Sequence, residues 1–299
     1  MMLWTAVVAW LTSVSGGREC LIFSSKVHGL LSPALSLLLV FKTNTAYNRF
    51  WEGRKVWEKL SNLSRNYIRQ VSLYNGHSGG PPSIRRSALH LSAFPYALAE
   101  HLTTNHRHAT QLGAYLSPSE ARRVESSFNK PLAVLALMTK HVRRIPECPD
   151  PARQDHLRST PFSSRDRLSL LKVIEDMTKC VGACERLVAT PVPSSYGRHT
   201  ARFLGTYCLT LPLAVVSDLG FLAVPAVGLL TWVLYGVQEI GVMIENPFGE
   251  GALDLAELSD HMACDALAMA KEEVEISEEL AHPHHPHHHL EGRSRYLSS

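Results

Sequence analysis

The sequence lacks the short motifs that mark several common classes of enzyme. No HExxH, GxxxxGK[ST] or GxGxxG pattern occurs in its 299 residues, which leaves no metalloprotease helix, phosphate-binding loop or dinucleotide fingerprint. The histidines are scattered, and the sequence places no evident nucleophile beside them. We therefore assign no catalytic residue and expect a protein that is not an enzyme.

The sequence also has no large excess of one charge over the other and no cysteine pair at metal-binding spacing. Thirty Lys and Arg residues against 27 Asp and Glu residues give a net charge of +3, a surplus too small to indicate a nucleic-acid partner. The six cysteines include no CxxC pair, and a chain of this length does not need disulfides to hold its core. We expect no metal site and no cofactor.

The alternation of apolar and polar residues that predicts a half-buried strand is missing as well. Apolar residues are instead gathered in blocks, which a mean hydropathy of −0.04 conceals. Proline and glycine inside the later blocks are tolerated better in lipid than in water, so membrane helices are favoured over a buried hairpin of a soluble protein. The first block is shorter than the roughly 20 residues that span a bilayer. The blocks occupy residues 1–14, 20–41, 203–216 and 219–237.

The residues between the blocks have the spacing of soluble helices. Residues 81–102 and 117–145 repeat apolar positions every three or four residues, and Ser117 and Ser119 are candidate N-caps of the second segment. The sequence therefore predicts an all-α, multi-pass membrane protein with four transmembrane helices and a helical cytoplasmic or stromal part. The expected divisions are two membrane helices with a helical extension, a soluble-side helical region, a transmembrane hairpin and an acidic, His-rich tail, at 1–75, 76–200, 201–245 and 246–299.

Charge also predicts which side of the membrane carries the soluble part. Residues 42–69 hold seven basic side chains and two acidic ones, so this end of the second membrane helix is expected to face the cytoplasm, stroma or matrix. The His-rich run HPHHPHHHL at 282–290 admits two interpretations, a metal-binding tract or a disordered tail, and we favour the disordered tail because no carboxylate or cysteine scaffold lies near it.

Four stretches together resemble the bestrophin-like family of ion channels. The first, FKTNTAYNRFWEGRKVWEKL, follows the second apolar block, and the other three occur in the family's order. The form SYGRHTARFL in the third is more similar to the bacterial, plant and algal branch than to the animal one. The other stretches are NKPLAVLALMTK at 129–140, TPVPSSYGRHTARFL at 190–204 and QEIGVMIENPFGE at 238–250.

The resemblance implies a homopentamer in a lipid bilayer, in which the second membrane helices ring a central pore. Pro33, Leu37 and Phe41 recur every four residues and so lie near one helix face. By resemblance, five copies of this stripe would form an apolar pore neck, a constriction that gates by dewetting. The residues alone also allow ordinary helix packing for the same stripe.

The remaining candidate site residues follow from the same resemblance. Polar lining below the neck is expected from Asn44, Thr45 and Asn48, and a second constriction from Leu168. The inner mouth, or else pairing between helices, is expected from Arg49, Glu52, Arg54 and Glu239. Animal members bind calcium after the NPFGE element, but here NPFGEGALD retains only Glu250 and Asp254, too few oxygen ligands for calcium gating.

The expected function is that of a passive anion channel, with chloride as the ion. Two alternatives stay open: a non-conducting membrane scaffold of the same fold, and a channel selective for bicarbonate, nitrate or cations. The protein is expected to be integral to a membrane, either a chloroplast membrane (thylakoid or envelope) or the plasma membrane.

Overall fold

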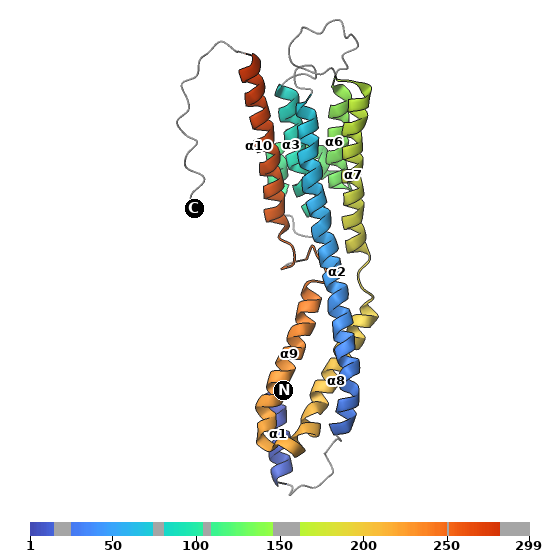
Figure 1. The fold of residues 1–299 in the computed structure, drawn as a ribbon, viewed down its shortest axis with the longest axis vertical. Helices are drawn as coiled ribbons and strands as arrows, with labels where there is room; N and C mark the ends of the chain where they lie inside the picture. Colours follow the sequence, from blue (N-terminus) through green and yellow to red (C-terminus); the bar gives the residue numbers. More distant parts are fainter. Residues whose placement is uncertain (15–24, 74–80, 104–108, 146–161, 250, 282–299) are drawn as a thin grey trace, which may run out of the picture. The chain divides into compact units, whose positions relative to one another are not determined.

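The computed structural model describes residues 1–14, 25–73, 81–103, 109–145, 162–249 and 251–281. Every regular element in these ranges is a helix (Figure 1), as the missing strand pattern predicted. The α-helices are α1 (Met2–Val14), α2 (Ser25–Ser72), α3 (Pro81–Leu102), α4 (Ala109–Tyr115), α5 (Pro118–Glu125), α6 (Lys130–Arg144), α7 (Ser164–Ala189), α8 (Ser194–Leu219), α9 (Ala223–Met243) and α10 (Leu255–Ala281).

The second apolar block and the charged stretch after it form one continuous helix. Helix α2 has 48 residues and contains Pro33 in its interior. The segment 117–145 differs from its prediction, because it is divided into α5 and α6. A new helix begins after Asn129, which is the N-cap of α6. Its side-chain oxygen accepts a hydrogen bond from the backbone N–H of Leu132 at 3.1 Å. Ser117 is the N-cap residue of α5.

The predicted hairpin turns slightly later than the apolar blocks suggest. Helix α8 continues through Ser217 and Asp218 and ends at Leu219. Gly220 follows with a φ of 53°, a backbone conformation that favours glycine because it has no Cβ. One short 3-10 turn, Gly220–Leu222, then leads into α9.

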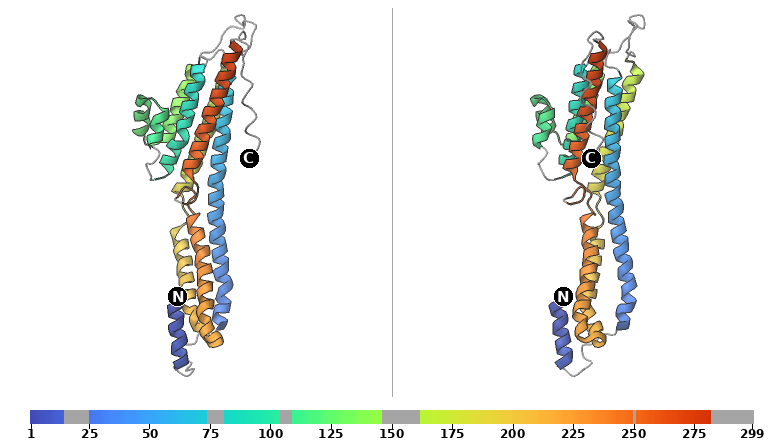
Figure 2. Two further views of the ribbon diagram at one scale, coloured as in Figure 1. Left: turned by 90° about the vertical axis from the view of Figure 1, so that its left-hand side faces the viewer. Right: turned by 60° about the vertical axis from the view of Figure 1, so that its left-hand side comes forward.

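The chain divides into two compact units. Unit 1 contains α1, α8, α9, the part of α2 up to Lys59 and the part of α7 from Cys180 onward. Figure 2 shows α8 and α9 side by side in both of its views. One buried cluster of unit 1 joins α1 to the hairpin through Val8, Ala9, Val216 and Ala223.

Much of unit 1's outer surface is apolar. Trp232 of α9 is 73% exposed and Leu229 is 61% exposed, and large apolar side chains continue along the helix. Water disfavours a contiguous apolar surface of this kind, which indicates contact with lipid or with another protein surface. The other exposed apolar residues of α9 are Leu230, Val233, Tyr235, Ile240, Val242 and Met243.

Unit 2 contains the rest of α2 and α7 together with α3, α4, α5, α6 and α10. Its central helix is α3, in which every residue of 90–100 is buried. The Tyr96 hydroxyl donates to Asp260 of α10 at 2.6 Å, and the Ser92 hydroxyl donates to the carbonyl of Ala263 at 3.3 Å. Figure 2 shows α10 running beside α2 and α3. Unit 2 thus has the polar inter-helix contacts and buried core of a soluble bundle.

Candidate functional site

Helix α2 carries the predicted neck residues on its exposed side. Leu37 is 55% exposed and Phe41 is 54% exposed, and Pro33 is exposed as well. The side of α2 that packs within unit 1 instead carries Leu35 and Leu39, which are buried against Leu204 and Cys208 of α8. Side chains two positions apart on a helix point in directions that differ by about 200°, so the neck stripe points away from this packing face.

Exposure alone does not distinguish the stripe from its neighbours on α2. Val40 is 61% exposed and Leu30 is 81% exposed, so apolar side chains are exposed in several directions around the helix. The assignment of Pro33, Leu37 and Phe41 to a pore neck therefore stays a prediction, supported by their spacing and by the resemblance.

The polar residues expected below the neck are exposed too. Asn44, Thr45 and Asn48 follow the apolar stripe along α2, and all three are exposed. The Thr45 hydroxyl donates to the carbonyl oxygen of Phe41 at 2.8 Å. Its hydrogen is therefore engaged with the helix backbone, and the two amide side chains are the stronger candidates for hydrogen-bond donation to an anion.

Arg49 contacts backbone carbonyls at the ends of two other helices. Its guanidinium donates to the carbonyl oxygens of Leu187 at 2.6 Å, Thr190 at 2.7 Å and Glu245 at 2.9 Å. Leu187 lies in the last turn of α7, Thr190 directly follows that helix, and Glu245 follows the end of α9. Helix C-termini leave carbonyls without hydrogen-bond partners and carry partial negative charge. A guanidinium supplies both the missing N–H donors and a compensating positive charge.

The other residues assigned to the inner mouth have different surroundings. Glu52 pairs with Arg186 near the end of α7, and Arg186 is a residue that the sequence reasoning missed. Its place in the last turn of α7 is a weak clue, since basic residues are favoured there. Arg54 is half-buried and Glu239 is exposed.

The NPFG element packs against α2 at a glycine that the sequence reasoning did not single out. A Cβ built on Gly53 would lie 2.8 Å from Cβ of Pro247 and 3.4 Å from the ring of Phe248. The segment is held in its own turn, where the backbone N–H of Leu253 donates to the carbonyl of Pro247 at 3.1 Å. Gly53 therefore allows a close approach that any larger residue would prevent.

The residue expected at a second constriction lies on α7 within unit 2. Leu168 is 66% exposed, whereas Ile174, six residues later, is 5% exposed and belongs to the core. An exposed leucine near the start of α7 agrees with a role at an opening or an interface. Its assignment to a constriction stays a prediction.

The expectations about metals fall partly outside the described ranges. Within them, no three His, Cys, Asp or Glu side chains gather closely enough to hold a metal ion. Glu250 of the candidate calcium loop and the His-rich run 282–290 lie outside these ranges.

The run GHSGG at 76–80 has the spacing of a GxSxG motif and also lies outside the described ranges. It follows helix α2, whereas a nucleophile elbow requires a preceding strand.

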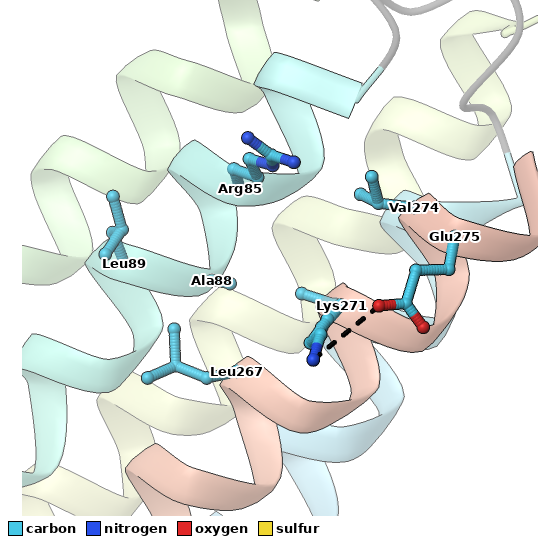
Figure 3. A pocket seen from close by; sticks show the side chains of 8 residues that line it. Arg85, Ala88, Leu89, Leu267, Lys271, Val274 and Glu275 are labelled. Carbon is cyan, nitrogen blue, oxygen red and sulfur yellow. Dashed lines mark ion pairs between the residues drawn. The ribbon is translucent and has the colours of Figure 1, made fainter. Parts of the chain in front are cut away.

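A groove of about 540 Å³ lies between α3 and α10 of unit 2. Figure 3 shows Ala88 and Leu89 of α3 and Leu267 of α10 among the side chains that line the groove, with Arg85 and the Lys271–Glu275 pair nearby. The atoms of that ion pair are 3.6 Å apart. The groove is mainly apolar and brings together no converging polar groups that suggest chemistry.

The chain matches the family described as Bacterial/Fungal Bestrophin protein over residues 1–267. A voltage-dependent anion channel-forming protein of Synechocystis is 33% identical over 241 residues, covering 78% of this chain and 73% of the relative. Voltage-dependent chloride channel 2, chloroplastic, of Arabidopsis thaliana is 31% identical over 229 residues, covering 76% of this chain and 52% of the relative.

Solved structures show the same fold. A crystal structure of a bacterial bestrophin homologue from Klebsiella pneumoniae matches with a TM-score of 0.78 and 20% identity. The match covers 90% of this chain and 96% of that one. The resemblance inferred from the four stretches is confirmed.

Proposed function

Because this chain belongs to the bacterial and fungal bestrophin family, we propose that it is a passive anion channel that conducts chloride. The observation that carries the proposal is the exposed face of α2, where an apolar stripe is followed by amide side chains on the same helix. Relatives named as anion and chloride channels support the sign of the ion.

The channel would be integral to a membrane, with four helical passes formed by α1, the first part of α2, α8 and α9. The stretch Ser194–Met243, which holds α8 and α9, is long and apolar enough to cross a membrane, with a mean hydropathy of 2.1 in its most apolar window and 22% of that window buried. The 13 described residues of α1 are fewer than the roughly 20 of a full span.

A pore requires several copies, because one exposed helix face cannot enclose a path. The family resemblance supports a homopentamer in which five α2 helices surround the path. Pro33, Leu37 and Phe41 would then form stacked apolar rings that water enters reluctantly. Asn44 and Asn48 would offer N–H donors to a partly dehydrated anion without the strong binding of a fixed charge.

The membrane would be that of a chloroplast, as the Arabidopsis relatives' names suggest, or the plasma membrane. A non-conducting scaffold of the same fold is the alternative from another class, and a channel selective for bicarbonate, nitrate or cations is the alternative within the class. Nothing in the proposal requires catalysis.

Reversal potentials of the purified protein in planar bilayers test the proposal directly. Under a potassium chloride gradient we expect the reversal potential to move toward the chloride equilibrium potential. Replacing chloride by gluconate on one side should reduce the current carried by chloride. A reversal toward the potassium potential would identify a cation channel, and silence in every preparation of correctly assembled protein would favour the scaffold.

A further inference from the structure

A small basic cavity lies between α3, α5 and α6 of unit 2, on residues with no part in the proposed pore. Its volume is about 230 Å³, smaller than the roughly 300–1,000 Å³ of sites for drug-sized ligands. Four of its lining side chains are permanently or normally cationic, and two more are imidazoles. The cations are Arg86, Arg123, Lys140 and Arg144.

One carboxylate lines the cavity, and its hydrogen-bonding capacity is already used. Glu120 accepts hydrogen bonds from Arg86 at 2.6 Å and from the Ser117 hydroxyl at 2.6 Å. It also accepts from the Ser117 backbone N–H at 3.1 Å. Burial opposes ionisation, but these bonds outweigh it and lower the pKa of Glu120 to about 2. Glu120 therefore balances Arg86 and remains ionised at neutral pH.

The other three cations lack a balancing carboxylate of this kind. In the ranges that the structure describes, Arg123, Lys140 and Arg144 form no ion pair with a carboxylate. They come from two helices, α5 and α6, and converge on one cavity. All three are exposed to solvent, which screens their mutual repulsion, and an anion between them would reduce that repulsion further.

A buried imidazole supplies a second, independent observation. His90 is 3% exposed; its Nε2 lies 3.1 Å from Glu120, and its Nδ1 is buried without a hydrogen-bond partner among the described residues. A buried polar atom left unpaired is costly and rare in folded proteins. If Nε2–H donates to Glu120, Nδ1 is the unprotonated nitrogen of the neutral ring and gains a proton only when His90 becomes cationic.

We propose that this cavity binds a small doubly charged oxyanion of the phosphate class, on residues other than those of the proposed pore. Phosphate and sulfate fit within the volume with room for water, and arginine guanidiniums match their oxygen geometry. The source is either a free oxyanion or the phosphate of a lipid headgroup, which present the same chemistry. Binding would tie α3, α5 and α6 together and so stabilise unit 2.

Proton uptake should accompany binding. Burial lowers the pKa of His90 and of His141, whose ring centroid lies 6.0 Å from that of His90. The charges acting on this pair include Glu120, Arg86 and Arg144. An anion favours the cationic imidazole and raises its pKa, so affinity should increase as pH falls below the pKa of the occupied site and should level off below the lower pKa of the free site.

Isothermal titration of the purified full-length protein with sodium sulfate, at constant ionic strength in a chloride background, tests the proposal. Sulfate keeps its charge at neutral pH, so any pH dependence belongs to the protein. We expect saturable binding that weakens about tenfold in Arg144→Gln and again in Arg123→Gln. The chain offers matched controls in Arg143→Gln and Arg122→Gln, the adjacent arginines, which do not line the cavity.

Three outcomes distinguish the proposal from its rivals. Equal weakening in the control and cavity variants would overturn it, since that result means diffuse attraction to a solvated basic surface. A binding heat that does not change between buffers of different ionisation enthalpy would overturn the proton coupling. Vesicles with and without phosphorylated lipid headgroups separate the two sources. If sulfate binds in lipid-free detergent, the ligand is a free oxyanion. If the cavity is occupied only when the vesicles contain phosphorylated headgroups, the ligand is a lipid.

Discussion

Gly53 of α2 and Pro247 of the NPFG element lie so close that a Cβ on the glycine would meet Cβ of the proline at 2.8 Å. Atoms of real side chains do not approach this closely, so either α2 or the turn after α9 would have to move. The contact joins the charged stretch of α2 to a second family-like stretch far away in the sequence, and it explains why the residue between Glu52 and Arg54 has no side chain.

Gly53→Ala should therefore destabilise unit 1, by about 1–3 kcal/mol, as overpacking commonly does. Thermal melting in detergent measures the effect. The matched control is Gly182→Ala in α7, where nothing lies within 4 Å of the added Cβ. That variant should be neutral or slightly stabilising, because alanine favours helix more than glycine does. Equal melting temperatures for the two variants would contradict the close approach.

Arg49→Lys should lower stability almost as much as Arg49→Ala. A lysine ammonium cannot direct donors at three carbonyls in three positions, and the loss should amount to about 1.5–3 kcal/mol. Arg54→Lys serves as the control, since Arg54 makes none of the contacts that Arg49 makes with the ends of α7 and α9. A lysine variant that melts like the unaltered protein would show that charge alone is sufficient.

Leu37→Ala and Phe41→Ala should increase current several-fold, while the reversal potential stays nearly constant. Each change removes five copies of an apolar side chain from the proposed neck and lowers its barrier to wetting. Leu39→Ala is the control, because Leu39 is 4% exposed and packs against α8. That variant should lose about 2–5 kcal/mol of stability without opening the pore. The reverse pattern would place the pore on the other face of α2.

Calcium chelation should leave the conductance unchanged. The stretch after NPFG contains Gly251, Ala252 and Leu253 where a calcium loop would supply carboxylates. Single-channel recordings in chelator and in micromolar calcium test this. A steep calcium dependence would reveal oxygen ligands beyond the two acidic residues retained in the sequence.

Glu120→Gln should destabilise unit 2 at neutral pH. The folded protein lowers the pKa of Glu120 from 4.5 to about 2, so the ionised carboxylate contributes stability that is present above about pH 4.5 and is lost as pH falls toward 2. The melting temperature of the variant should be lower than that of the unaltered protein at pH 7, and the two should converge in acid. A difference that is independent of pH would mean that the amide destabilises the fold through its shape rather than through the lost charge.

Periodicity and resemblance predicted the helices well where a helix has a strong apolar pattern. Residues 81–102 were expected as a helix and form α3 with the same bounds. Residues 117–145 were expected to continue as helix but are interrupted, because one local hydrogen bond from Leu132 to Asn129 begins α6. A pattern averaged over several helical turns cannot detect whether one side chain interrupts a helix and caps a new one.

For the candidate site, the sequence could predict which residues of α2 share a face, while their role in a pore stays a prediction. Four-residue spacing placed Pro33, Leu37 and Phe41 on one face without any tertiary information. The partners of Arg49 could not be predicted in this way, because they are backbone carbonyls supplied by segments more than 130 residues away. Backbone atoms carry no residue-specific pattern, so only the fold identifies them.

Arg49 also has an electrostatic consequence for any ion that passes near it. A helix C-terminus carries roughly half a negative elementary charge, and the guanidinium touches the ends of both α7 and α9. The two ends together about cancel its single positive charge. The guanidinium and the helix ends that it touches should therefore attract anions from solution less strongly than an arginine without such partners.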